Sequence, residues 1–280
     1  MPDPTPPADY VEARPHPGLA GLVLRYTGYQ EFSPQPLRRR QPPSGSCTLI
    51  LSLGPPLRLS GPAGPSAPRS FLAGMHDATV FTEFTGPQRG VQVDLTPLGA
   101  LTLLGRPMSE LANLCPALDE LDRPALAGLP DRLAAHPAWP HRFARLDATL
   151  LTALDATRLR PDPEVAWAWR QLVRTGGTAA VARLAEGTGW SRRHLQTRFR
   201  HQVGLGPKTT GRVLRFGRAA GLLAAGAPSI SDVAASCGYA DHAHLARDFR
   251  ALAGCTPGEY RAETARPGSD PFKPAAGVGS

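Results

Sequence analysis

The chain has 280 residues, with 31 lysines and arginines against 23 aspartates and glutamates, and a formal net charge of +8 at pH 7. This length suggests two domains, and because no apolar run is long enough to cross a bilayer, no membrane partner is expected. The 4 cysteines are scattered along the sequence, which is typical of a reducing, cytoplasmic compartment and predicts neither a metal site nor a cofactor.

The first third of the chain predicts strands. Residues 1–17 are rich in proline and are expected to be disordered. Short apolar or alternating runs bounded by glycine and proline follow at 22–26, 47–53, 80–84 and 90–95, with a long hairpin loop over 54–68. Closely spaced strands of this kind predict a small, cupin-like β-barrel or sandwich, and with the helices that follow they give an α+β chain.

From residue 97 the apolar spacing becomes helical. It predicts helices at 98–104, 108–115, 124–135, 140–157 and 163–174. The fourth helix has an apolar stripe formed by Phe143, Leu146, Leu150, Leu151 and Leu154. Packing inside the domain is the favoured interpretation of this stripe, and a dimer interface is the alternative.

Residues 178–203 have the pattern of a helix-turn-helix unit. Thr178 is expected to cap a first helix, glycines at 187 and 189 form the turn, and Ser191 caps a second helix. In that second helix Leu195, Phe199 and Val203 recur every four residues and predict a buried stripe. At about 100° per residue the polar side chains on the opposite side point outward; they are Arg193, Gln196, Thr197 and Arg200.

A second unit of the same kind covers residues 229–253. Ser229 or Ser231 caps its first helix, a glycine at 238 makes the turn, and Asp241 caps its second helix. The inward stripe of the second helix is Leu245, Phe249 and Leu252. The outward residues are Ala243, His244, Arg247 and Arg250, with His242 at the margin.

A predicted helix over 207–225 joins the two units. About 18 residues of helix span about 27 Å, and successive major-groove faces of B-DNA lie about 34 Å apart. Between residues 176 and 265 there are 12 lysines and arginines against 6 acidic residues. A cationic segment with two exposed recognition-type helices at this spacing predicts binding to double-stranded DNA across two adjacent major grooves.

Residues 178–261 resemble the DNA-binding domain of the AraC/XylS family of bacterial transcription regulators. The matching runs are 181–185, 191–200, 204–208 and 230–234, followed by Gly238, Tyr239, Phe249, Thr256 and Pro257. The resemblance implies seven helices, two helix-turn-helix units and a linking helix, with base contacts from 193, 196 and 197 in the first unit and from 243, 244 and 247 in the second. The sequence departs from the family pattern at Leu245, where an aromatic residue is usual. The complete set of expected DNA-binding residues is Arg192, Arg193, Gln196, Thr197, Arg200, His242, Ala243, His244, Arg247 and Arg250.

The family layout implies a sensor and dimerisation domain over 18–160, a linker with a short helix over 161–177, a DNA-binding domain over 178–265 and a disordered tail over 266–280. The expected partners are double-stranded DNA, a second copy of the chain, RNA polymerase and a small-molecule effector of unknown identity.

Two alternatives stay open. The N-terminal domain could only dimerise or bind a protein, which a filled barrel core would favour, whereas a tight apolar pocket would favour an effector. A barrel enzyme with an accessory DNA-binding module is disfavoured because nucleophile and phosphate-binding motifs are absent. The spacing of His242 and His244 suits a metal, but DNA contact is the favoured interpretation on an outward helix. The run 75–77 around His76 is interpreted as a turn.

Overall fold

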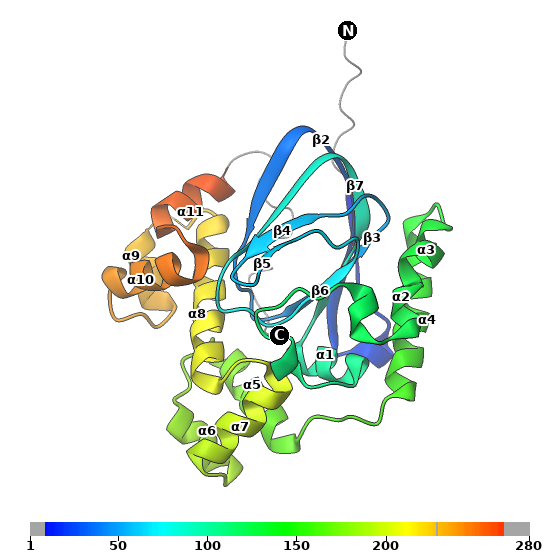
Figure 1. The fold of residues 1–280 in the computed structure, drawn as a ribbon. Coiled ribbons are helices and arrows are strands. Elements are labelled where there is room, and N and C mark those ends of the chain that lie inside the picture. The colour runs from blue at the N-terminus through cyan, green and yellow to red at the C-terminus, as the bar shows by residue number, and fades with distance from the viewer. Residues whose placement is uncertain (1–8, 228, 266–280) are drawn as a thin grey trace.

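A computed structural model describes residues 9–227 and 229–265 (Figure 1). Strands β1 to β7 come first, and almost all of the helical structure follows residue 96. The predicted α+β class is confirmed. The expected disorder of residues 1–8 and 266–280 lies outside the described residues.

The strands form one antiparallel sheet in the order β1-β2-β7-β3-β6, with β4 paired to both β5 and β7. Their bounds are Asp9–Ala13 for β1, Val23–Gln41 for β2, Cys47–Ser52 for β3, Arg58–Gly61 for β4, Gly64–Ser66 for β5, Phe71–Ala73 for β6 and Val80–Leu95 for β7. Because different strands, β1 and β6, end the main order, the sheet is open and does not close into a barrel.

Several predictions about strands were wrong. The predicted loop over 54–68 contains the paired strands β4 and β5, and β2 extends far beyond the predicted run 22–26. Residues 9–13, expected to be disordered, form β1 on the edge of β2, and the hydroxyl of Tyr10 donates to Glu31. The runs 80–84 and 90–95, expected as separate strands, belong to the single strand β7. Gly86 pairs with Ser33, where the register between β2 and β7 shifts, and it adopts a positive φ of 80°. The pairing of β7 with β2 continues on both sides of this irregularity.

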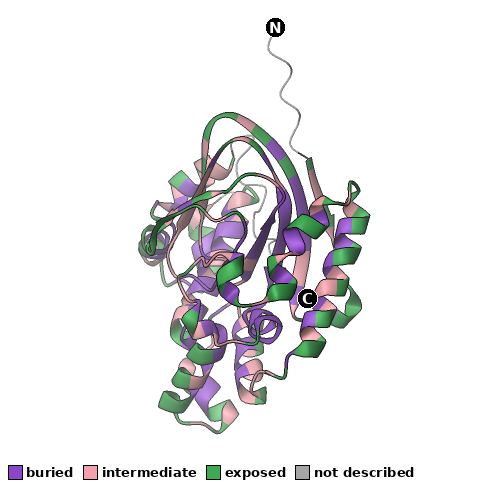
Figure 2. Ribbon diagram, turned by 45° about the vertical axis from the view of Figure 1, so that its right-hand side comes forward, coloured by how far each residue is buried: buried purple, intermediate pink, exposed green. Residues whose placement is uncertain are grey.

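One face of the sheet is apolar and covered by helices. Side chains such as Tyr26, Leu49 and Val93 on this face are almost fully buried. The helices beside the sheet are α1 (Pro97–Leu104) and α4 (Trp139–Ala156), and Gly28 leaves room for the ring of Trp139. Every residue of α1 is buried, whereas α4 has a buried side and an exposed side. Figure 2 shows the same alternation of buried and exposed positions along the helices at the edge of the molecule.

The helices after α1 depart from prediction in two places. Residues 108–115 form only the short 3-10 turn η2 (Met108–Glu110), and 124–135 divide into α2 (Pro124–Ala127) and α3 (Leu129–Ala134), separated at Gly128. Two further 3-10 turns are η1 (Pro17–Leu19) and η3 (Leu118–Leu121). In α4 the expected stripe packs within the domain, because Phe143, Leu146 and Leu150 are buried.

The described residues after 160 form seven helices, the number that the resemblance implied, but one of them lies in the predicted linker, outside residues 178–261. They are α5 (Pro163–Arg174), α6 (Val181–Thr188), α7 (Arg192–Val203), α8 (Pro207–Ala224), α9 (Ile230–Ser236), α10 (His242–Ala253) and α11 (Pro257–Thr264). The long helix α8 runs through this part, with α6 and α7 at one end and α9 and α10 at the other (Figure 1). Helix α5, predicted within a linker, packs against α6, α7 and α8 and buries Trp169 and Leu172.

The C-terminal helices pack directly on the sheet domain. Helix α7 contacts α1 and η2. At the end of α7, Gly204 lies so close to η2 that a Cβ atom added to it would be 3.1 Å from the Met108 carbonyl oxygen. Leu214 of α8 lies over Gly45, between β2 and β3, where a Cβ would be 2.6 Å from its Cδ2. The two parts therefore share a continuous buried core. Among the residues described, no helix is both long and apolar enough to cross a membrane.

Candidate nucleic-acid interface and an interdomain cavity

Helix α7 begins and ends where the sequence predicted. The Ser191 side chain accepts a hydrogen bond from the His194 backbone N–H, and the helix ends at Gly204, which has a φ of 101°. Leu195, Phe199 and Val203 have no measurable exposure. In contrast, Thr178 does not cap α6: the helix begins three residues later after Ala180, and the Thr178 hydroxyl donates to the Thr175 carbonyl.

Helix α10 repeats this construction in the second unit. Asp241 accepts from the His244 backbone N–H at 2.6 Å, and Ser229, one of the two expected caps, accepts from the Asp232 N–H at the start of α9. The predicted stripe of Leu245, Phe249 and Leu252 is fully buried. The helix ends at Gly254 in the left-handed conformation.

The expected DNA-binding residues lie on the outer sides of these two helices. Nine of them are exposed, and His244 is half-buried because its ring meets the edge of Tyr239. Their exposure leaves these side chains accessible to a large partner. The described residues contain no group of three histidine, cysteine or acidic side chains that could hold a metal ion, and His242 and His244 lie on this outer surface.

Two arginines on the same helical scaffold have structural partners instead. Arg198 of α7 forms a two-point pair with Asp162, just before α5, with distances of 2.8 and 2.9 Å. Arg212 of α8 donates to the buried carboxylate of Asp248 on α10 at 2.7 Å. Sequence analysis did not identify these pairs. Asp248 is buried although it lies between the exposed residues Arg247 and Arg250, so the charge of a residue does not by itself tell on which side of the helix it lies.

A cavity of about 1110 Å³ lies between the sheet domain and the C-terminal helices. Its floor is the face of the sheet opposite α1 and α4, and its far wall comes from α5 and α11 through residues such as Trp169, Val173 and Tyr260. The cavity lies between the two parts of the chain, and the apolar core of the sheet domain itself is filled, so neither alternative for the N-terminal domain is decided by it.

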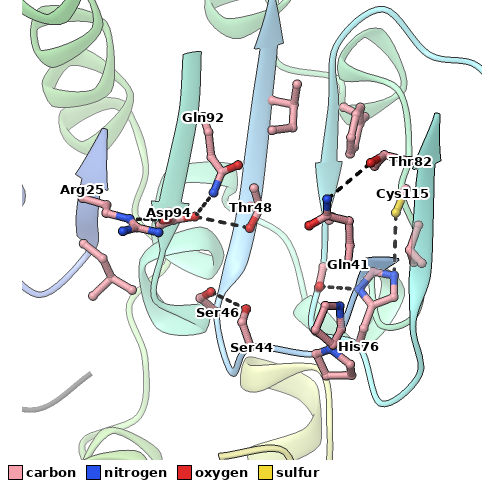
Figure 3. Close-up of a pocket in the computed structure, with 18 of the residues that line it drawn as sticks. Arg25, Gln41, Ser44, Ser46, Thr48, His76, Thr82, Gln92, Asp94 and Cys115 are labelled. Atoms are coloured by element: carbon pink, nitrogen blue, oxygen red, sulfur yellow. Dashed lines mark hydrogen bonds and ion pairs between the residues drawn. The ribbon is translucent and has the colours of Figure 1, made fainter. Parts of the chain in front are cut away.

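The floor of the cavity is polar. Asp94 of β7 is the centre of one cluster (Figure 3): Arg25 donates to it at 2.6 Å, Gln92 at 2.8 Å and Thr48 at 3.5 Å. Sequence analysis predicted no residues of this cavity. The available signal was the polar alternation in an otherwise apolar strand, since residues 88, 92 and 94 share one face of β7.

A second charged cluster lies further along β2. Arg39 donates two hydrogen bonds to Glu31, at 2.8 and 2.7 Å, and Tyr10 donates a third at 2.9 Å. Burial, with the negative charge of Glu31 beside it, raises the pKa of Tyr10, so its hydroxyl keeps its proton and acts as a donor. This cluster ties the edge strand β1 to the cavity wall.

His76 and Cys115 form a third polar group at the opposite end of the floor (Figure 3). His76 Nδ1 lies 2.7 Å from the Gly74 carbonyl oxygen, and its Nε2 lies 3.7 Å from the Cys115 sulfur. Burial lowers the pKa of His76 and raises that of Cys115 to about 12. Both groups are therefore neutral at pH 7, and the thiol is not activated as a nucleophile.

Polar contacts also connect the sheet to the second helix-turn-helix unit. Arg40 of β2 donates to the Ala253 carbonyl at the end of α10 and pairs with Glu263 of α11 at 3.2 Å. Thr79, just before β7, donates to the Leu252 carbonyl at 2.7 Å. Arg40 and Glu263 also border the cavity, so these contacts lie between the cavity and the second unit.

Comparison with known proteins places this geometry in context. Residues 184–263 match a family model described as a helix-turn-helix domain, and residues 11–116 match a domain of unknown function, DUF6597. The F1 operon positive regulatory protein of Yersinia pestis is 38% identical over 74 residues, which are 26% of this chain and 25% of that protein. The match thus spans only about a quarter of that curated relative.

Two solved structures are similar to parts or most of this chain. ToxT from Vibrio cholerae covers 86% of this chain and 98% of its own, at 10% identity and a TM-score of 0.48. A transcriptional regulator from Chromobacterium violaceum with an AraC-type DNA-binding domain covers 38% of this chain and 96% of its own, at 29% identity and a TM-score of 0.35.

Proposed function

We propose, from the match of residues 184–263 to a helix-turn-helix family model and their resemblance to the AraC type, that the whole protein is a sequence-specific DNA-binding transcription regulator controlled by a small molecule. The observation that supports DNA binding most directly is the pair of capped helices α7 and α10, whose cationic outer sides are exposed at opposite ends of α8. Each helix has the form that enters a major groove.

Different side chains would supply specificity and affinity. Arg193, Gln196 and Arg247 are long enough to donate to base edges, and arginine can bind guanine with two hydrogen bonds. Arg200, near the end of α7, is placed to meet phosphate, which adds affinity without selecting a sequence. The operator would then span two successive major-groove faces.

The interdomain cavity supports control by an effector. A molecule bound there would touch the sheet and also the helices α5 and α11 of the DNA-binding part. A ligand that fits one arrangement of the two parts better than another shifts the population toward that arrangement, and with it the affinity for DNA.

We further propose that the regulator acts in the cytoplasm as a homodimer and activates transcription through contact with RNA polymerase. The partial relative from Yersinia pestis is named as a positive regulator, which supports activation. A dimer would double the length of DNA contacted and is the usual arrangement for palindromic sites.

Gel shift and footprinting on the DNA upstream of its own gene test DNA binding. We expect protection of two adjacent major-groove faces and an affinity that falls steeply as salt rises, because each neutralised phosphate releases counterions. Equal affinity for the upstream DNA and for random DNA, or protection of only one groove face, would contradict the proposal.

A further inference from the structure

The charges on the cavity floor balance one another. Arg25 pairs with Asp94 and Arg39 pairs with Glu31, and all four side chains belong to β2 or β7. The carboxylates of Asp94 and Glu31 have side-chain exposures of only 10% and 6%. A buried pair that is already neutral offers no net attraction to a charged ligand, which would still lose its hydration on entry.

The same floor is rich in uncharged hydrogen-bonding groups. Gln88, Gln92 and Thr48 all line it, and Gln92 uses one amide hydrogen on Asp94. Groups that both donate and accept match hydroxyl or amide groups of a ligand.

An apolar patch occupies the other side of the cavity. Ile50, Leu59 and Phe71 form a small buried cluster of their own, and all three line the cavity. Arg38 and Arg170 also border it, but both are exposed, and the Arg38 guanidinium lies 4.0 Å from the centre of the Phe81 ring. Water screens charges in such positions, so they contribute little to selection inside the cavity.

We propose that the effector is an uncharged amphiphile, with hydroxyl or amide groups held at the Asp94 cluster and an apolar body on the patch of Ile50, Leu59 and Phe71. This inference rests on the proposed function, because it names the chemistry of the controlling ligand. The size of the cavity is at or above the usual upper range of small-molecule sites, which leaves room for both parts of such a molecule.

Matched probes test the charge of the ligand. Octyl glucoside, octanoate and octylammonium share one alkyl chain and differ in the charge of the head group. Their binding to the full chain, below micelle formation, is measured by calorimetry and by intrinsic tryptophan fluorescence, to which Trp169, the tryptophan among the cavity-lining residues, contributes. We expect octyl glucoside to bind at least about tenfold more tightly than either ion, the scale of one hydrogen-bonded contact.

A charge-changing variant makes the test specific to this site. Asp94→Asn keeps the shape of the side chain and removes one negative charge from the floor, so we expect the ratio of octanoate to octyl glucoside affinity to rise about tenfold or more. Asp119→Asn, the same change at an exposed position outside the cavity lining, is the control and should leave the ratio unchanged. If the Asp94 variant does not fold, Glu31→Gln removes one negative charge from the second cluster and carries the same expectation.

Tighter binding of octanoate or octylammonium by the wild-type protein would overturn the proposal, as would failure of all three probes to bind. An unchanged affinity ratio in both floor variants would overturn it as well. The proposed function is judged separately by footprinting without any probe. A protein that protects its operator but prefers octanoate is a DNA-binding regulator with an anionic effector, whereas a protein that binds octyl glucoside but no operator contradicts the proposed function alone.

Discussion

The two helix-turn-helix units are attached to the sheet domain in different ways. In the first unit, α6 with α7, the helix α7 packs on α1 and η2 of the sheet domain. In the second unit, α9 with α10, the side chains of Arg40 and Thr79 donate hydrogen bonds to backbone carbonyls at the end of α10. The two units have the same internal plan of cap, buried stripe and terminal glycine. From this difference in attachment we predict that the second unit separates from the sheet domain more readily than the first.

The largest expected effect comes from emptying the core of each unit. Phe199→Ala and Phe249→Ala each remove a fully buried ring and should destabilise the protein by about 3–5 kcal/mol. Hydrogen exchange checks where the loss appears. We expect Phe199→Ala to weaken protection in α1 and η2 as well as α7, and Phe249→Ala to weaken α9–α11 while leaving the sheet protected. If both variants lost protection in the same set of helices, the two units would not differ in their attachment to the sheet domain.

DNA binding should depend on both units. Arg193→Ala and Arg247→Ala should each cost about 1–3 kcal/mol on the operator and much less on random DNA, because each removes a proposed base contact. Arg200→Ala should weaken binding to all sequences alike and reduce the salt dependence. Filter binding at several salt concentrations measures both quantities. Equal losses on operator and random DNA would show that Arg193 and Arg247 contact phosphate only.

Removing the polar attachment of the second unit has a smaller expected effect. Arg40→Ala should cost about 1 kcal/mol, because the bond to the Ala253 carbonyl is partly buried and the pair with Glu263 is screened by solvent. We expect faster proteolysis within α9–α11 and an altered affinity for the second half of the operator. Arg58→Ala removes an exposed arginine that pairs with Glu83 away from the helices, and it serves as the control.

The smallest expected effect is a dependence of stability on pH through His76. Burial lowers its pKa from 6.5, so below that value the unfolded chain binds more protons than the folded one, and stability falls as the pH falls. Thermal melting between neutral and mildly acidic pH should show a shallower loss for His76→Gln than for wild type. An identical slope in the two proteins would mean that His76 does not contribute.

The helical part was largely predictable because its signals are local. A cap, an apolar residue every three or four positions and a terminal glycine lie within a dozen residues, and α7, α8 and α10 begin and end close to their predicted bounds. Thr178 failed as a cap because its hydroxyl donates to the Thr175 carbonyl in the turn after α5, and α6 begins only after Ala180. The base contacts assigned to the exposed residues stay a prediction.

The sheet was less predictable because its pairing is not local. The continuity of β7 through Gly86 depends on its register with β2, and the strand at residues 9–13 exists because an edge of β2 is available to it. The cavity residues come from segments as far apart as Arg25 and Glu263, so no window of sequence contains the site.

Sequence alone therefore determined the two capped, cationic helices and their spacing along one connecting helix. The reason is that the helical period decides, within a few neighbouring residues, which side chains are buried and which are exposed. Only the tertiary structure decided which face of the sheet is polar toward the cavity, which carboxylates and guanidinium groups neutralise one another, and which unit the sheet holds. These properties depend on contacts between strands and helices that lie far apart in the sequence. The free energy of such contacts is gained only when folding brings those segments together, so no local pattern in the sequence reports it.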